Sequence, residues 1–357
     1  MSGKKLIAID IGNNTTKIVY GTANKKNILV NEYEIISTPK DCINDGLVIN
    51  AEAIAKALKE AFKKNRMSNA ELVVNISGTG VITRDIQLPL STEQELSQIL
   101  AFEAQQYFPV DLENYTTDFK VLENMSGQEG NFSRVLVVAA PNKQLEGYIQ
   151  LSKLLKHPLH SIDIPSNSVL KLLSFRSEDD TDKDLDYAVV DIGKATSMVC
   201  ILRNNNLKFS RILLNGSAEI DSFIANKFNM EYRKAEEIKI AFNGTGSDAE
   251  GAGRQVDMAD LSETIDNALN NIMSDISRFI EFFNSRESMN QVRKIYVCGG
   301  GSLLSGIAEY FSGYFNMPAV QLPVKKEVVY KGKKGKSSFE KDYIRLVNAI
   351  GALIRVN

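Results

Sequence analysis

Two turns of this sequence share one pattern, in which an aspartate ends an apolar run and glycine and small polar residues follow it. Residues 8–21 are AIDIGNNTTKIVYG, and residues 189–202 are VVDIGKATSMVCIL. Glycine lets backbone N–H groups approach phosphate oxygens, and an aspartate at a strand end can hold Mg²⁺ through water. The pattern therefore indicates phosphate and metal chemistry, with Asp10 and Asp191 as candidate catalytic residues and Mg²⁺ ligands.

The residues after each aspartate could contact phosphate through backbone N–H groups, amides, hydroxyls or an ammonium group. These candidates are Gly12, Asn13, Asn14, Thr15 and Lys17 in the first turn and Gly193, Lys194 and Thr196 in the second. A single Asp-Ile-Gly is often only a turn, and Lys17 could instead be a solvated lysine at a strand end. Because the pattern occurs in both halves, we predict two hairpins, one per lobe, that grip the phosphates of a nucleotide.

A third stretch, CGGGSLLSG at 298–306, runs from an apolar strand through glycines into a helix. Such a turn lets a ligand lie flat on the backbone, and the helix N-terminus favours negative charge nearby. The candidate ligand-binding residues here are Gly299, Gly300, Gly301 and Ser302. The alternative is an ordinary strand-to-helix turn, which many α/β folds contain.

A fourth stretch, AEEIK at 235–239, lies in a predicted helix. Glu236 and Lys239 are three residues apart, so they share one helix face and could both reach one ligand. The alternative is an ion pair on the protein surface.

Strands and helices alternate around these motifs. Apolar, β-rich runs predict a hairpin at 5–21, a third strand around 28–37, and a strand pair at 71–78 and 81–88. Helical periodicity predicts a helix at 51–65. A capped helix opening at residue 91 and ending at Pro109 is followed by strand, strand, helix and strand, which indicates an inserted subdomain.

The second half opens with the other hairpin, after an acidic run at 176–186 that we predict to be a linker. A long helix is expected at 258–286 and a closing helix at 342–356. Since 357 residues exceed what one hydrophobic core usually serves, two lobes are expected. The predicted parts are a first lobe (1–87 plus 164–185), an inserted subdomain (88–163), a second lobe (186–230 plus 290–357) and its helical subdomain (231–289).

Composition restricts the function. A net charge of −2 argues against nucleic acid as the main ligand, and three separated cysteines suggest a reducing compartment. The N-terminus does not resemble a signal peptide, and no stretch approaches the roughly 18 apolar residues that cross a bilayer. We therefore expect a cytoplasmic protein that does not insert directly into the membrane.

In their order, the two hairpins and the glycine run resemble the first phosphate loop, second phosphate loop and adenosine motif of the actin-like ATPase superfamily. The resemblance implies a two-lobed α/β fold of the actin-like (ribonuclease H-like) kind that binds ATP and Mg²⁺. It also implies that Glu236 and Lys239 contact the ribose and base.

The stretch at 88–122 resembles the relocated subdomain of the PilM and FtsA families, and EAQQYFPVDLENYTTDF (103–119) is similar to PilM. That resemblance implies a type IV pilus assembly component at the inner face of the cell membrane. It would dock the short N-terminal cytoplasmic tail of a PilN-like membrane protein, in a groove between the first lobe and the inserted subdomain. Pilus assembly ATPases are further implied partners, and self-association is possible.

Two other functions stay open. An FtsA-like division or filament protein would need a membrane anchor, whereas the closing helix here occupies the place of a core helix. A small-molecule kinase would need a general base aimed at a substrate hydroxyl, and no substrate-specificity segment is recognised.

Hydrolysis is less clearly indicated than binding. In SIDIPSNSV (161–169), Asp163 is the carboxylate nearest the helix that returns to the first lobe, one residue from where chaperone ATPases place a glutamate. Asp163 is thus the candidate for positioning the attacking water, and its offset favours slow hydrolysis at most.

Overall fold

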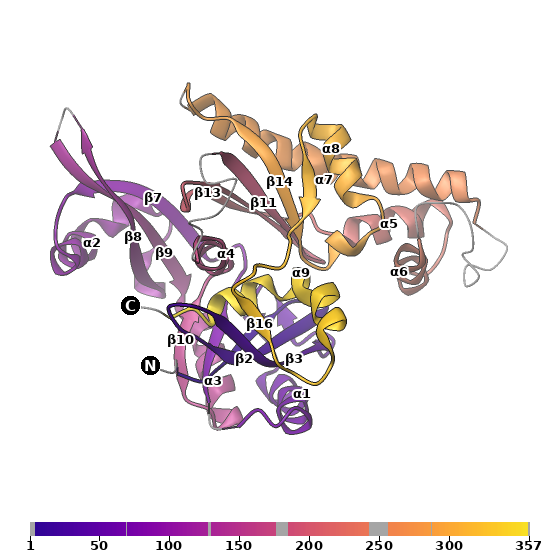
Figure 1. Ribbon diagram of the computed structural model, residues 1–357, viewed down its shortest axis with the longest axis horizontal. Helices are drawn as coiled ribbons and strands as arrows, with labels where there is room; N and C mark the ends of the chain where they lie inside the picture. Colours follow the sequence, from indigo (N-terminus) through magenta and orange to yellow (C-terminus); the bar gives the residue numbers. More distant parts are fainter. Residues whose placement is uncertain are drawn as a thin grey trace. The chain divides into compact units, whose positions relative to one another are not determined.

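The computed structural model describes residues 4–68, 70–127, 130–175, 185–242, 256–286 and 288–355. Most of the predicted linker, residues 176–184, lies outside this described part. The chain forms two units, each with its own sheet and helices (Figure 1). The first unit comprises Met1–Phe175, Val329–Lys333 and Asn348–Asn357, and the second unit comprises Arg176–Val328 and Lys334–Val347.

The first unit is built on a six-stranded sheet in the order β10-β6-β1-β2-β3-β16. β1 (Leu6–Ile11) and β2 (Thr15–Ala23) form the predicted antiparallel hairpin, and β3 (Ile28–Ser37) pairs with β2. β6 (Glu71–Asn75) and β10 (Leu159–Asp163) extend the sheet on the other side, with β6 parallel to both β1 and β10. Every residue of β1 is buried, as expected for a strand covered on both faces.

Helices cover this sheet. Figure 1 shows α1 (Ala51–Lys64) and α3 (Asn142–Leu155) on one side of it. The other side holds α4 (Pro165–Ser174) and the last residues of α9 (Lys336–Ala352), which belong to the first unit. The short strand β16 (Val328–Tyr330) lies at the β3 edge.

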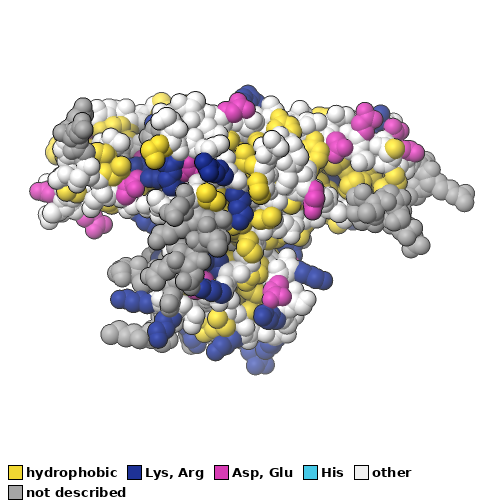
Figure 2. All heavy atoms as spheres, turned by 45° about the horizontal axis from the view of Figure 1, so that its top comes forward, with side chains coloured by type: hydrophobic (Ala, Val, Ile, Leu, Met, Phe, Trp, Pro, Cys, Tyr) yellow, Lys and Arg dark blue, Asp and Glu magenta, His cyan; other side chains and the backbone are white. Residues whose placement is uncertain are grey.

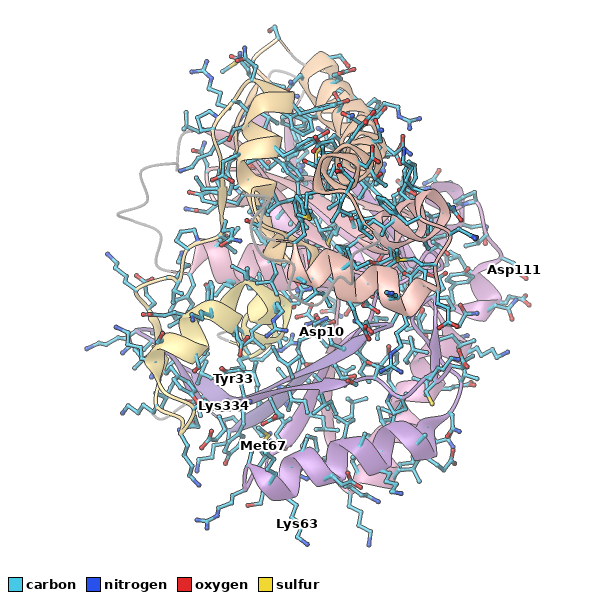
Figure 3. The ribbon with its side chains drawn as sticks, turned by 90° about the vertical axis from the view of Figure 1, so that its right-hand side faces the viewer. Asp10, Tyr33, Lys63, Met67, Asp111 and Lys334 are labelled. Carbon is cyan, nitrogen blue, oxygen red and sulfur yellow. The ribbon has the colours of Figure 1, made fainter. Side chains whose placement is uncertain are left out.

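α1 illustrates how the sequence makes a two-faced helix. The side chain of its cap residue, Asn50, accepts a hydrogen bond from the backbone N of Ala53 at 3.0 Å. Its apolar face is buried, with Leu58 fully enclosed. The exposed face carries the lysines Lys56, Lys59, Lys63 and Lys64. Lys63 points away from the helix in Figure 3, and Figure 2 shows Lys and Arg side chains gathered over this lower end of the first unit.

A separate three-stranded sheet in the order β7-β9-β8 forms the inserted part of the first unit. β7 (Ile82–Pro89) and β8 (Tyr115–Gly127) both pair antiparallel with β9 (Gly130–Pro141). α2 (Glu93–Tyr107) begins with the predicted capping box, and η1 (Leu112–Asn114) follows it. Their shared core consists of Leu88, Leu96, Leu100, Phe108, Val135, Val137 and Ala139.

The predicted pairing of residues 71–78 with residues 81–88 is wrong. β6 lies between β1 and β10 in the large sheet, whereas β7 pairs with β9 in the small one. The glycines between them therefore mark the passage from one sheet to another, not a hairpin. The predicted domain limits stay a prediction, and these pairings favour an inserted part that begins near Ile82.

The second unit contains a five-stranded sheet in the order β13-β12-β11-β14-β15. β11 (Asp186–Ile192), β12 (Ser197–Arg203) and β13 (Asn206–Leu213) form an antiparallel meander that begins with the second predicted hairpin. β14 (Val292–Cys298) runs parallel to β11 and to β15 (Ala319–Gln321).

A helical layer packs on this second sheet. α7 (Met258–Arg286) buries an apolar stripe that includes Leu261, Ile265 and Leu269. The other elements of this layer are α5 (Ala218–Lys227), α6 (Tyr232–Ala241), η3 (Gly301–Leu303) and α8 (Ile307–Phe315). Within the ranges described above, no helix combines the length and the apolar character that a bilayer crossing requires.

Candidate functional site

The first predicted phosphate turn is closed by its own backbone. The N of Gly12 donates to the carbonyl of Thr15 at 3.1 Å, and Asp10 lies opposite Lys17 in the hairpin register. Lys17 Nζ is 3.7 Å from Asp10 Oδ2, and a side chain at Gly12 would place its Cβ 3.2 Å from that ammonium. Because only 16% of the Lys17 side chain is exposed, it does not resemble a solvated strand-end lysine. The turn thus holds a carboxylate and an ammonium group beside bare backbone (Figure 3 labels Asp10).

Thr38, which sequence reasoning missed, supports this turn from the end of β3. Its Oγ1 donates to the carbonyl of Gly12 at 2.7 Å and lies 2.9 Å from Thr16 Oγ1. Its backbone N donates to the carbonyl of Asn14 at 2.9 Å. Asn13 and Asn14 remain exposed at the tip. The hydroxyl pair therefore fixes the backbone and leaves the tip open.

Asp10 belongs to a row of polar residues at the carboxyl ends of three parallel strands. Asn75 of β6 pairs in register with Asp10 on one side and with Asp163 on the other. Its amide is satisfied within the fold, since Nδ2 donates to the carbonyl of Asn348 and Oδ1 accepts from Ser168 Oγ, both at 2.8 Å. Ligands of open α/β sheets characteristically bind at this edge. The sequence indicated Asp10 and Asp163 as candidate site residues but did not indicate Asn75.

Asp163 is enclosed in an ion cluster. Its carboxylate accepts hydrogen bonds from Lys171 Nζ at 2.6 Å, Arg355 at 3.1 Å and the Asn167 side chain at 2.8 Å. Burial by itself would raise the pKa of Asp163, but the charges of Lys171 and Arg355 lower it below its ordinary value. Both carboxylate oxygens have protein partners, and the role of Asp163 in positioning water stays a prediction.

Burial lowers the pKa of two lysines in and beside this cluster, Lys171 and Lys120. Burial lowers the pKa of Lys171 to about 8, although the charge of Asp163 opposes the shift. Burial also lowers the pKa of Lys120, whose Nζ donates to Asn167 Oδ1 at 2.9 Å. Lys120 lies on β8 and Asn167 on α4, so this contact joins the inserted sheet to the rest of the first unit.

The second predicted turn repeats the backbone geometry of the first. The N of Gly193 donates to the carbonyl of Thr196 at 2.9 Å. The carbonyls of Gly193 and Lys194 accept from the N of Ser217 and the N of Ala218, both at 2.9 Å, where α5 begins. The backbone of this turn is therefore fixed by the helix that follows the sheet.

The glycine run meets Asp191 at the carboxyl ends of β11 and β14. Gly299 has a φ of +86°, and a Cβ there would lie 2.2 Å from Asp191 Oδ1. A Cβ at Gly301 would lie 2.3 Å from Cγ2 of Ile192, whereas Gly300 faces open space. Ser302 is buried, and its Oγ donates to the carbonyl of Gly299 at 2.7 Å. Glycine is thus required where the backbone closes over the aspartate.

α6 connects to the second turn through side chains. Lys194 Nζ lies 2.6 Å from Glu236 Oε1, and Lys239 Nζ lies 2.7 Å from Asp221 Oδ1. The Tyr232 hydroxyl donates to Asp221 Oδ2 at 3.0 Å, and burial together with this carboxylate raises the pKa of Tyr232 above its ordinary value. Sequence reasoning missed Asp221 and Tyr232, because both depend on how α5 and α6 pack.

The structure thus gathers the predicted residues into two groups. Asp10 and the first turn lie in the first unit, whereas Asp191, the second turn, the glycine run and α6 lie in the second. No group of three or more His, Cys, Asp or Glu side chains that could hold a metal occurs among the described residues. Each group offers one aspartate beside glycine backbone and a lysine.

The sequence profile of the family described as "Type IV pilus assembly protein PilM" matches residues 8–356 of the chain. The chain belongs to the PilM family. The resemblance to PilM predicted from residues 103–119 is therefore confirmed. Among sequences, cell division protein FtsA of Neisseria meningitidis serogroup B is 23% identical over 151 residues, which are 38% of this chain and 36% of that protein. The chain therefore spans little more than a third of that relative.

Solved structures are similar over nearly the whole chain. The structure titled "PilM-PilN type IV pilus biogenesis complex" matches with a TM-score of 0.83 at 22% identity, covering 98% of this chain and 97% of that one. EutJ of Carboxydothermus hydrogenoformans matches with a TM-score of 0.58 at 12% identity, covering 97% and 88%. MreB5 of Spiroplasma citri bound to AMPPNP matches with a TM-score of 0.53 at 14% identity, covering 97% and 94%. The predicted two-lobed, actin-like α/β fold of this PilM-family chain is confirmed.

Proposed function

We propose that this PilM-family chain binds Mg-ATP and docks the N-terminal cytoplasmic tail of a PilN-like membrane protein during pilus assembly. The observation that carries the nucleotide half is the arrangement at the strand ends. In both units an aspartate at the carboxyl end of a buried strand lies beside glycine backbone. The likeness to MreB5 bound to AMPPNP supports the same ligand class.

Mg²⁺ fits the donors that the chain offers. Mg²⁺ keeps several waters and needs only one or two carboxylates together with phosphate oxygens. Asp10 and Asp191 are the candidates, and in ATP-bound protein the metal would neutralise phosphate charge. Lys17, held 3.7 Å from Asp10, is placed to add a positive charge near the first turn.

Isothermal titration with Mg-ATP tests the nucleotide half. Asp10→Asn and Asp191→Asn keep side-chain size but remove a charge, and each is expected to weaken Mg-ATP binding at least tenfold. Asp111→Asn is the matched control, because Asp111 is exposed at the start of η1 and far from Asp10 in Figure 3. Unchanged affinity in both site variants would refute the proposed site.

Hydrolysis is proposed to be slow at most. Lys171 and Arg355 donate to Oδ2 of Asp163 and Asn167 donates to Oδ1, so a water at this carboxylate would compete with protein donors at either oxygen. Phosphate release from Mg-ATP by the purified chain measures this directly. Rapid turnover that depends on Asp163 would contradict the proposal.

The partner half is supported by the likeness to the PilM of the PilM-PilN complex, over 98% of this chain. We propose that the tail lies between the inserted sheet and the rest of the first unit, where Lys120 of β8 meets Asn167 of α4. Such docking would hold the chain at the inner face of the membrane through its partner. Pilus assembly ATPases and a second copy of the chain are further proposed partners.

Fluorescence anisotropy with a labelled peptide tests the docking. The peptide is the N-terminal cytoplasmic tail of the PilN-like protein from the same genome, and a scrambled peptide of equal composition is the control. Saturable binding of the tail alone would support the proposal. Equal binding of both peptides, or of neither, would contradict it.

A further inference from the structure

Two side chains of opposite charge that we propose as nucleotide ligands satisfy each other in the second unit. Lys194 Nζ, from the second turn, lies 2.6 Å from Glu236 Oε1 of α6. Their side chains are 22% and 24% exposed, so solvent and ligands reach both of them. The lysine belongs to the second predicted phosphate turn, and the glutamate is the proposed ribose contact.

Tyr232 also contacts the Lys194 ammonium. The ammonium lies 5.2 Å from the centre of the Tyr232 ring, within the range of a cation–π contact. Tyr232 and Glu236 are four residues apart on α6, so the ring and the carboxylate lie on one helix face. The hydroxyl is fixed to Asp221, which is fully buried. The ring that contacts the ammonium is therefore anchored to α5 through its hydroxyl.

The Lys194 ammonium can move away from Glu236 and Tyr232 by side-chain rotation, without a movement of the backbone. Its carbonyl is held by the N of Ala218 at 2.9 Å, which fixes the backbone of the turn. A lysine side chain has a flexible four-carbon stem and three rotatable donors, so the ammonium can turn toward another anion. A partly exposed ion pair contributes little stability, whereas a polyphosphate offers several negative charges.

We propose that Glu236 and Tyr232 bind the Lys194 ammonium when no nucleotide is present, and we call this pair the seat. Phosphate must draw the ammonium away from the seat before it can bind Lys194. The inference rests on the proposed nucleotide site and adds how that site is occupied before ATP arrives. When phosphate takes Lys194, Glu236 Oε1 loses the ammonium and can accept a hydrogen bond from a ribose hydroxyl. Binding of the phosphates by Lys194 thus favours binding of the ribose by Glu236, and binding of the ribose favours binding of the phosphates.

Titration with inorganic tripolyphosphate and with adenosine separates the two ends. Glu236→Gln frees Lys194, so tripolyphosphate should bind about two- to fivefold more tightly, the range of a surface ion pair. The same variant should weaken adenosine binding mainly when tripolyphosphate is also present, because without phosphate the Lys194 ammonium occupies Glu236 in the native chain. Glu237→Gln is the matched control, since this neighbouring glutamate pairs with Arg233 at 3.3 Å and is exposed.

The Tyr232 part has its own pair of variants. Tyr232→Leu removes the ring and should tighten tripolyphosphate binding, whereas Tyr232→Phe keeps the ring and should change it little. In a Lys194→Gln background, Glu236→Gln should no longer affect tripolyphosphate binding, because the ammonium for which Glu236 and phosphate compete is gone. Thermal melts show that each variant is folded before titration.

The outcomes distinguish failure of the seat from failure of the proposed nucleotide site. If the native chain binds ATP but Glu236→Gln tightens tripolyphosphate no more than Glu237→Gln does, the seat is overturned and the proposed site survives. If the native chain binds neither ATP nor tripolyphosphate, the proposed site fails and the seat fails with it.

Discussion

At the scale of single residues, the buried carboxylate of Asp163 has the most demanding environment of the candidate site. It is 6% exposed and lies against Lys171 and Arg355. Removing one partner of a buried ion pair leaves an uncompensated charge and typically costs about 3–5 kcal/mol. We therefore expect Asp163→Ala to lower the free energy of unfolding by about that amount, measured by urea denaturation.

The comparison variants make that expectation specific. Asp163→Asn retains hydrogen-bonding capacity and should be milder than Asp163→Ala. Asp118→Ala changes an exposed aspartate of β8 and should shift the free energy of unfolding by no more than about 0.5 kcal/mol. Equal effects of Asp163→Ala and Asp118→Ala would show that the cluster is not a stabilising contact.

Lys171 carries the pH dependence of the same cluster. Its pKa falls from 10.5 to about 8 on folding, mainly through burial. Between these two values the unfolded chain binds more protons, so this group favours the folded state increasingly as pH rises. Its contribution is complete above the unfolded pKa and is lost as pH falls through about 8.

The measurement compares melting temperatures of the native chain and Lys171→Gln from about pH 7.5 to about pH 10.5. The melting temperature of the native chain should rise relative to that of the variant as pH increases across that window. Both proteins share every other titrating group, so the difference reports Lys171 together with its electrostatic coupling to neighbours such as Lys120. A difference that is flat or that declines with pH would contradict the assigned pKa direction.

At the scale of elements, the glycine run after β14 divides into positions with opposite requirements. Gly299→Ala would bring a Cβ against Asp191 and the Ile192 backbone, in a left-handed conformation that suits glycine. We expect this variant to be strongly destabilised or misfolded. Gly300→Ala meets no atom within 4 Å, so it should fold normally.

Circular dichroism melts of the two alanine variants check this expectation. Gly300→Ala then serves as a folded reagent for the nucleotide site, where an added methyl group at the proposed ligand surface should weaken ATP binding. If Gly299→Ala melts at the native temperature, the close approach of backbone and aspartate is not required.

The crossing of α9 over α4 depends on another glycine. A Cβ at Gly351 would lie 2.0 Å from the carbonyl oxygen of Ser168, so Gly351→Ala should lower the free energy of unfolding by about 1–3 kcal/mol. Gly313 of α8 faces open space, and Gly313→Ala should instead stabilise by about 0.5–1 kcal/mol through helix propensity. Opposite signs in urea denaturation are the expected result, and matching signs would contradict it.

The elements also show what a single sequence can and cannot predict. The hairpins at Asp10 and Asp191 were predictable because apolar β-rich runs, glycine and strand length are local signals. The β6–β7 pairing failed, because two apolar runs joined by glycines also fit strands of different sheets. Thr38 and Asn75 were missed for a related reason: Asn75, for example, is satisfied by Asn348, which is distant in the chain.

At the scale of the whole molecule, nucleotide binding should increase the thermal stability of the folded chain. A ligand that binds only the folded state stabilises it by an amount that grows with the ratio of its concentration to Kd, about 2.7 kcal/mol at one hundred times Kd. Mg-ATP at that ratio should therefore raise the melting temperature by a few degrees, and the increase should grow with concentration. Removing Mg²⁺ with a chelator should reduce the increase, since the proposed carboxylates act through the metal.

The variants decide whether both units contribute to that effect. Asp10 belongs to the first unit and Asp191 to the second. If one nucleotide contacts both aspartates, either Asn variant should abolish most of the Mg-ATP effect, and the double variant should lose little more. If the nucleotide instead contacts only the second unit, Asp10→Asn should keep the full native shift while Asp191→Asn loses it. That outcome would reduce the proposed site to Asp191, the glycine run and α6, and would leave the first turn without a role in ATP binding.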